Sequence, residues 1–420
     1  MEAYLLDWAN LLLRWLHVIV AIAWIGSSFY FVWLDNSLKP PVDDKLKQQG
    51  VGGELWAVHG GGFYNPQKYL GAPPKLPEDL HWFYWESYST WLSGFSLFSL
   101  VYLFNAKTYL IDPSVAQLTP TVAVVLALGF LVLGWIVYDL LCRLFGKNEK
   151  LLSTLVVLYV VAAAWGACHL FSGRAAFLII GAMIATIMSA NVFFWIIPGQ
   201  RKVVASMKAG EPVDPIHGKN GKQRSVHNTY FTLPVLFAML SNHYSMTYTA
   251  PHNWLVLVLI MVAAVFIRQF FILRHKGNTN MAYPTIAIVI LAAVAAWIAP
   301  KPAEPAPAVA AVSTTASSAS ASAPANAAAP ATAATAGATP AAPGLAQVQQ
   351  IVQARCIQCH SSKPTLMPTP AKGLILEQPE QVQAKAQLIY QQVVQQKLMP
   401  LGNLTNITDA ERATIAQWFE

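Results

Sequence analysis

The sequence predicts an all-α protein: a polytopic membrane bundle of about eight helices, then a linker and a small helical domain. Three observations lead to this fold class. The 420 residues are 55% hydrophobic and only 11% charged, whereas soluble proteins carry about 25% charged residues. The apolar residues come in blocks of about 20, the length that crosses a bilayer core. An Ala/Pro-rich stretch then separates these blocks from a last segment of ordinary soluble composition.

The apolar blocks place all expected spans within the first 299 residues. Two long segments interrupt them, a polar, Gly-rich insert at 35–87 and a basic loop at 198–225. The lipid bilayer is therefore the first expected partner of this region. The expected spans are 10–34, 88–111, 121–145, 151–172, 174–197, 226–247, 252–273 and 282–299.

Residues 300–343 are almost all Ala, Pro, Ser and Thr, and such a segment cannot bury enough apolar surface to fold. It is expected to be a linker whose ends lie on the order of 35–40 Å apart. The expected domains are thus a membrane domain at 1–299, the linker at 300–343 and a soluble domain at 344–420. The last is short, and a large cofactor would supply the missing core.

The distribution of Lys and Arg predicts the orientation. Basic residues collect in cytoplasmic loops, which accounts for the net charge of +7 without nucleic-acid binding. The loops after the first, third, fifth and seventh spans are basic, while the opposite loops hold little more than Lys107 and Arg174. Both termini are therefore expected on the periplasmic side of a bacterial inner membrane. Glu2 and Asp7 precede the first apolar block, so no cleavable signal peptide is expected.

Cys356, Cys359 and His360 form a C-x-x-C-H motif. Two thiols at this spacing attach haem covalently, and the adjacent histidine becomes the proximal iron ligand. An expected helix precedes the motif, and Met399 and a closing helix follow it, which is the order of a class I cytochrome c. A zinc or thiol motif of the same spacing is the alternative. The sequence thus predicts a cytochrome c domain with one covalent haem c, outside the membrane.

The expected iron ligands are His360 and Met399. A methionine ligand raises the haem potential, so this domain is expected to accept electrons readily. Met367 is the rival, but it follows His360 so closely that reaching the opposite haem face is awkward, and Met399 is favoured. The remaining cysteines, Cys142 and Cys168, lie in apolar spans and are expected to be inert packing residues.

Four histidines fall at similar depth in the outer half of the expected bundle: His17, His169, His243 and His252. Ionisable groups in spans are costly and often functional, and histidines of facing helices can hold haem b. A haem b near the periplasmic face is therefore a second candidate cofactor, with His17 and His169 as first ligands and His243 as another. Structural or interfacial histidines are the alternative. Arg14 would pair a propionate or substrate anion, or extend to the interface.

A second polar cluster is expected on the inner side of the bundle. Its segment 81–86 is rich in aromatic residues, for which an interfacial aromatic belt is the simpler explanation. Glycines beside His59 permit close approach of the backbone to a ligand, or form a flexible loop. The cluster is nevertheless a candidate catalytic site. Its members are His59, His81, Glu86, Arg224, His227 and Asn228.

Several polar and aromatic strings resemble the bacterial membrane-bound urate oxidase (urate hydroxylase) family with a fused cytochrome c domain. The resemblance covers residues 1–299 and the cytochrome region. It implies oxidation of urate to 5-hydroxyisourate in purine catabolism, with electrons passed to the chain's own haem c and on to the respiratory chain. A soluble cytochrome c or a terminal oxidase would accept them. The strings lie at 53–64, 81–88, 90–94, 224–230 and 241–244.

The inner cluster suits this chemistry, because urate is an anion near pH 7 and is made in the cytoplasm. Arg201 or Arg224 is expected to steer it, with His59, His81 or Glu86 as general base. Urate oxidation releases two electrons, whereas haem c takes one. The electrons would therefore pass singly, or a haem b would hold one of them.

Two other functions fit parts of the sequence. One is an electron-transfer module from quinol to cytochrome without an organic substrate, against which the long insert at 35–87 argues. The other is a transporter with a redox sensor domain, for which an internal repeat would be expected and is not seen.

Overall fold

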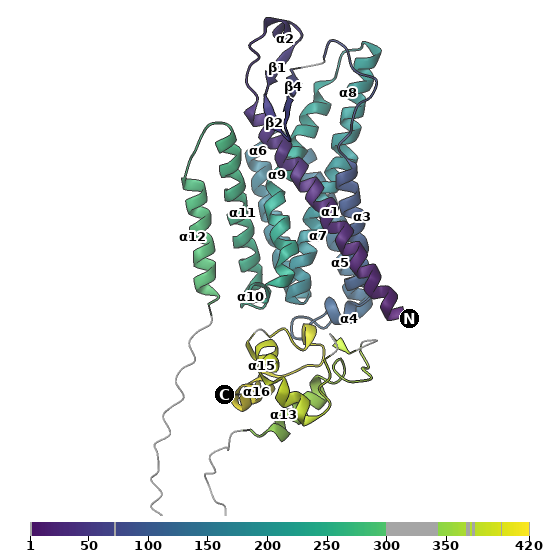
Figure 1. Cartoon of the computed structure of the whole chain (residues 1–420), viewed down its shortest axis with the longest axis vertical. Helices are drawn as coiled ribbons and strands as arrows, with labels where there is room; N and C mark the ends of the chain where they lie inside the picture. The colour runs from purple at the N-terminus through teal and green to yellow at the C-terminus, as the bar shows by residue number, and fades with distance from the viewer. Residues whose placement is uncertain are drawn as a thin grey trace, which may run out of the picture.

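The computed structural model describes residues 2–70, 73–299, 343–366, 370–371, 374–395 and 397–419. Helices dominate both the bundle and the small C-terminal domain (Figure 1). The expected linker at 300–343 lies outside the described residues, apart from its last position. The rival ligand Met367 also lies outside them.

The described bundle has a helix at each of the expected spans, and five of these helices are long and apolar enough to cross a membrane. By helix length and composition, this confirms a membrane-type bundle, while the count of eight spans stays a prediction. The five are α1 (Glu2–Ser37), α5 (Pro120–Phe145), α6 (Glu149–Leu170), α7 (Gly173–Asn191) continued through η2 (Val192–Ile196) and α8 (Ile197–Ala209), and α11 (Asn253–His275).

The other three helices differ from simple spans for physical reasons. Helix α3 (Trp85–Phe98) passes into a π-helical turn, η1 (Ser99–Leu103). Helix α9 (Pro215–Leu240) begins with a basic, polar half. Helix α12 (Ala282–Trp297) has 16 residues, and these cover only about 24 Å at 1.5 Å per residue.

Helix α7 forms the centre of the bundle and packs against α5, α6 and α9. Its side chains Phe177, Ile180 and Met183 are fully buried. Glycines allow the close helix crossings, because a Cβ at Gly134 would lie 2.4 Å from Met183 Cγ, and one at Gly181 would lie 2.9 Å from the Cβ of Ala238.

The insert between α1 and α3 contains short strands, which corrects the all-α expectation for this segment. It holds α2 (Asp44–Gln48) and two antiparallel pairs: β1 (Val51–Glu54) with β4 (Gln67–Tyr69), and β2 (Ala57–His59) with β3 (Gly62–Tyr64). Gly60 and Gly61 have φ values of +58° and +79°, as a two-residue hairpin turn requires. The glycine run therefore builds a turn beside His59.

The C-terminal domain packs α13 (Leu345–Arg355) against α16 (Asp409–Phe419). Between them lie α14 (Pro379–Ala384), α15 (Ala386–Ile389), η5 (Tyr390–Gln395) and η6 (Leu401–Asn403). The domain lies against the bundle end that carries α4 (Ala106–Tyr109), η3 (Ser241–His243) and α10 (Ser245–Tyr248) (Figure 1). The N-terminus of α1 lies at the same end.

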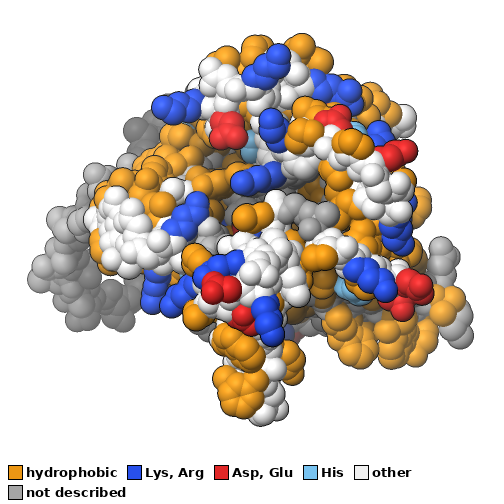
Figure 2. Space-filling view, turned by 90° about the horizontal axis from the view of Figure 1, so that it is seen from above, with side chains coloured by type: hydrophobic (Ala, Val, Ile, Leu, Met, Phe, Trp, Pro, Cys, Tyr) orange, Lys and Arg blue, Asp and Glu red, His pale blue; other side chains and the backbone are white. Residues whose placement is uncertain are grey.

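The opposite end of the bundle is basic. Lys and Arg side chains gather there around the ends of several helices (Figure 2). This separation of charge is consistent with the expected orientation, although the side of the membrane stays a prediction. Exposed members are Lys39, Lys45, Lys47, Arg143, Lys147, Lys150, Arg201, Lys202, Lys208, Lys219 and Lys222.

Candidate functional site

A buried ion pair joins α5 to α9 toward the basic end of the bundle. Arg224 is 2% exposed, and its Nη2 donates to Asp139 Oδ1 at 2.7 Å. Asp139 also accepts from Trp195 Nε1 at 2.7 Å and from Arg143 Nε at 2.6 Å. The Arg224 guanidinium lies 4.8 Å from the centre of the Trp195 ring. Arg224 is thus neutralised inside the protein, which leaves exposed Arg201 as the candidate to steer an anion.

A chain of hydrogen bonds continues from this pair. Asn191 Nδ2 donates to Asn228 Oδ1 at 2.9 Å and to the Tyr138 hydroxyl at 3.1 Å. The Tyr138 hydroxyl lies 2.7 Å from His227 Nδ1. A hydroxyl oxygen can accept from Asn191 and either accept from or donate to His227, so both ring tautomers fit this contact. The network therefore holds His227 through its Nδ1.

The insert residues of the expected cluster lie elsewhere. His59 and His81 are exposed, and the His81 ring meets Phe83 edge-to-face at 4.6 Å. Glu86 is half-buried in the first turn of α3. The structure thus brings together the three cluster residues of α9 and leaves the two histidines of the insert on the surface.

Sequence reasoning missed the partners that make this network: Tyr138, Asp139, Asn191 and Trp195. Asp139 had a readable signal, because a charged residue within an apolar span is a functional suspect. Arg268 on α11 carries the same signal. It is 4% exposed, its Nε and Nη2 have no hydrogen-bond partner among the described residues, and its guanidinium lies 4.4 Å from the Phe29 ring centre.

The outer histidine His17 is packed against α3. Its Nδ1 lies 3.1 Å from Ser93 Oγ, and a Cβ at Gly94 would lie 2.8 Å from His17 Cε1. Only glycine accommodates the ring at this crossing. These contacts agree with the structural alternative, and haem ligation by His17 stays a prediction.

The other expected haem b ligands face different surroundings. His169 is exposed, and its Nδ1 lies 2.7 Å from Trp165 O. His243 is exposed in η3, and Arg14 donates to Asn10 on the surface of α1 at 3.0 Å. Within the described ranges, no hydrogen bond or ring contact joins two of these histidines. Two histidines that share a haem lie on its opposite faces, so a haem b at these residues stays a prediction, and the function proposed below does not use it.

The C-x-x-C-H residues do fit a covalent haem c. Cys356 and Cys359 are free thiols. His360 Nδ1 lies 3.3 Å from Leu374 O, which orients the ring and leaves Nε2 available for iron. Burial lowers the pKa of His360, opposed by the Leu374 bond, so the neutral form that binds metal is favoured. Met399 packs against the core of the same domain.

The family model described as urate oxidase N-terminal matches residues 3–299. The chain belongs to this family. The match covers the whole bundle with its insert and polar network, so this urate oxidase-related region is the oxidoreductase part of the chain. The C-x-x-C-H domain lies beyond the matched residues. No curated protein and no solved structure matches the chain.

Proposed function

We propose that this chain oxidises urate to 5-hydroxyisourate and passes the electrons to a haem c held by its own C-terminal domain. The observation that carries the proposal is the family match over residues 3–299, next to a domain whose donor set suits covalent haem. Urate and water give 5-hydroxyisourate, two protons and two electrons. A bound haem c would accept these electrons one at a time. An external acceptor, a soluble cytochrome c or a terminal oxidase, must therefore reoxidise the domain between them.

The residues of the bundle have separate expected tasks. Arg201 is exposed on the basic end, with its guanidinium 6.0 Å from the Tyr84 ring centre, and would attract the anion. The general base stays assigned to His59, His81 or Glu86. His227 would exchange a proton through Nε2, because the Tyr138 hydroxyl occupies Nδ1. The buried Arg224–Asp139 pair would hold α5 and α9 in register.

An anaerobic optical spectrum of the purified full chain in detergent, before and after adding urate, tests the proposal. We expect the c-type α-band to rise with urate alone. Single Ala variants of His59, His81 and Glu86 in the same assay would locate the base. If dithionite reduces the haem and urate does not, the substrate assignment fails. Reduction by a quinol without urate would instead favour an electron-transfer module.

A further inference from the structure

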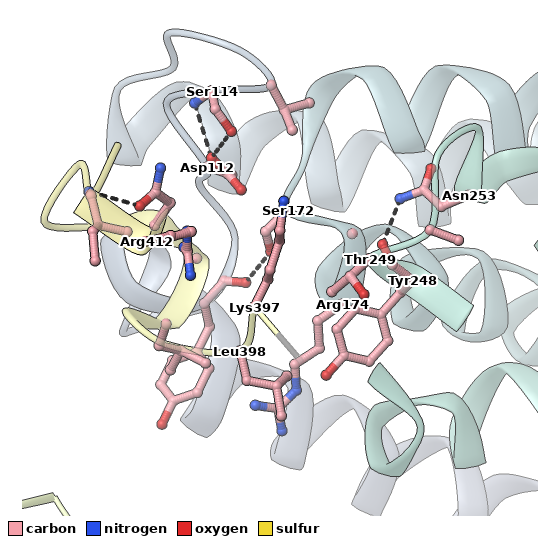
Figure 3. A pocket seen from close by; sticks show the side chains of 18 of the residues that line it. Asp112, Ser114, Ser172, Arg174, Tyr248, Thr249, Asn253, Lys397, Leu398 and Arg412 are labelled. Carbon is pink, nitrogen blue, oxygen red and sulfur yellow. Dashed lines mark hydrogen bonds between the residues drawn. The ribbon is translucent and has the colours of Figure 1, made fainter. Parts of the chain in front are cut away.

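A cavity of about 470 Å³ lies where the C-terminal domain meets the bundle (Figure 3). The bundle contributes Ser172, Arg174 and Tyr248 to its wall, and the C-terminal domain contributes Lys397 and Leu398. Pockets of this size hold small organic ligands. The cavity is thus large enough for a planar heterocycle with some of its water.

Close contacts hold the two walls together. Gly402 has φ +58°, and a Cβ there would lie 2.9 Å from Ile111 O of the bundle. Leu398 packs against the buried core of the bundle. Burial lowers the pKa of Arg412, and the carboxylates of Asp409 and, across the junction, Asp112 oppose this shift. The cavity is therefore bounded by fitted surfaces.

The charges in the cavity leave one cation uncompensated. Lys397 pairs with Asp409 at 3.7 Å, and Arg412 donates to Met399 O at 3.0 Å while it faces Asp112. Arg174 has no acidic partner in the described part of the chain. A half-buried guanidinium without a counter-ion favours an anionic ligand.

Arg174 is held in a fixed orientation at the cavity. Its Nε donates to Asn242 Oδ1 at 3.0 Å, and the Tyr102 hydroxyl donates to the same oxygen at 3.1 Å. Its guanidinium lies 5.9 Å from the centre of the Tyr109 ring, another residue of the wall. Nε is used by Asn242 and the Tyr102 hydroxyl also hydrogen-bonds the Arg174 side chain, so the remaining guanidinium donors are left for a ligand. The site therefore combines a positioned cation with an aromatic surface.

We infer that this cavity binds the urate anion, with Arg174 as its main contact and the C-terminal domain as its lid; the inference rests on the proposed function. Its wall includes Lys397, Leu398 and Leu401, which flank the expected iron ligand Met399. A urate bound here would lie beside the segment that is expected to hold the haem iron. A urate in this cavity lies at the opposite end of the bundle from Arg201, His59, His81 and Glu86, which then take no part in its oxidation. The helix between Arg224 and Ser241 spans 17 residues, about 25 Å.

Arg268 is the competing cation inside the bundle. It also lacks an acidic partner in the described ranges, and its Nε and Nη2 are unpaired. However, it is 4% exposed and lines neither of the two described cavities. Arg174 is preferred because it already faces an open space next to the Met399 segment.

Equilibrium dialysis of radiolabelled urate against the dithionite-reduced full chain tests the inference, since reduced protein binds urate without oxidising it. We expect Arg174→Gln to weaken urate binding about 10- to 100-fold, the loss of a charge-assisted contact. Arg174→Lys keeps the charge but not the planar fork, and should bind with intermediate affinity.

The control is Lys150→Gln, at an exposed position on the opposite end of the bundle, which should bind urate as wild type does. Thermal unfolding and the haem spectrum report folding, and Arg174→Lys replaces Arg174→Gln if the latter does not fold.

The outcomes separate this inference from the proposed function. If Arg174→Gln binds urate like wild type while urate still reduces the haem, the junction site is wrong and the proposed function stands. Loss of binding in Arg268→Gln alone would move the anion into the bundle and also overturn the inference. If wild-type protein neither binds urate nor is reduced by it, both fail.

Discussion

At the residue scale, the buried pair of Arg224 and Asp139 has the largest expected effect on stability. The Arg224 side chain is 3% exposed and that of Asp139 12%. Removing one partner of a buried pair leaves an uncompensated charge, which typically costs 3–5 kcal/mol. Asp139→Asn should therefore lower the free energy of unfolding by about 3 kcal/mol, read as a lower Tm in detergent.

The matched control for this substitution is Asp35→Asn. Asp35 also pairs with a cation, Lys68, but both side chains are more than half exposed. Exposed pairs contribute about 0–1 kcal/mol, so the Tm should change little. Equal losses in both variants would contradict the buried role of Asp139.

The sequence predicted the residues of the C-x-x-C-H motif but not the partners of Arg224. Cys356, Cys359 and His360 are adjacent in the chain, so their chemistry can be read without a structure. The partners of Arg224 come from α5 and α7, and only the packing of three helices decides that Asp139 and Asn191 meet at α9. Their presence in apolar spans marked them as unusual, but not as partners.

At the element scale, the apolar blocks predicted the positions of the long helices, because burial from water sets their length. The ends were less predictable. Helix α1 continues to Ser37 and α9 begins at Pro215, since polar residues extend a helix beyond the apolar block. The strands of the insert were missed because each has only three or four residues, too few for a periodic pattern.

The closing helix α16 begins with a reciprocal capping box. Thr408 N donates to Glu411 Oε2 at 2.7 Å, and Glu411 N donates to Thr408 Oγ1 at 3.2 Å. Arg355 Nε, at the end of α13, donates to Glu411 Oε1 at 3.0 Å. One carboxylate therefore starts α16 and joins it to the helix before the haem motif.

These contacts make the stability of α16 depend on pH. Burial of Glu411 opposes its charge, but the bonds from Thr408 and Arg355 outweigh this and lower its pKa. Because the folded-state pKa is lowered, the ionised carboxylate stabilises the fold at pH values above the unfolded-state pKa of about 4.3. This stabilisation is lost as the pH falls through the folded-state pKa. Glu411→Gln should thus cost about 1 kcal/mol at pH 7, and less as the pH falls below 4.

Hydrogen exchange of the α16 amides measures this local stability. The control is Glu380→Gln, in the first turn of α14, where the carboxylate is exposed and the change should stay within about 0.5 kcal/mol. A loss in Glu411→Gln that is equal at pH 3 and pH 7 would show that the ionised carboxylate has no special role.

At the scale of the whole molecule, the arrangement of the two parts of the chain would decide how electrons leave the bundle in the proposed function. A tether of the expected length would let the C-terminal domain move between the bundle and an external acceptor. In the docked position shown in Figure 1, Gly402 and Leu398 contact the bundle. In the proposed function the domain would accept an electron there, leave and return.

Gly402 allows this docking to be tested separately from the fold. Gly402→Ala introduces a Cβ 2.9 Å from Ile111 O, and φ +58° strains any side chain there. Gly210→Ala has the same strain at φ +70° but nothing within 4 Å, at the basic end of the bundle. Each should cost about 1–2 kcal/mol from backbone strain.

Only Gly402→Ala should raise hydrogen exchange at 106–111 and slow haem reduction by urate, with the dithionite-reduced spectrum unchanged. Equal exchange at 106–111 in the two variants would mean that the domain does not rest on this surface.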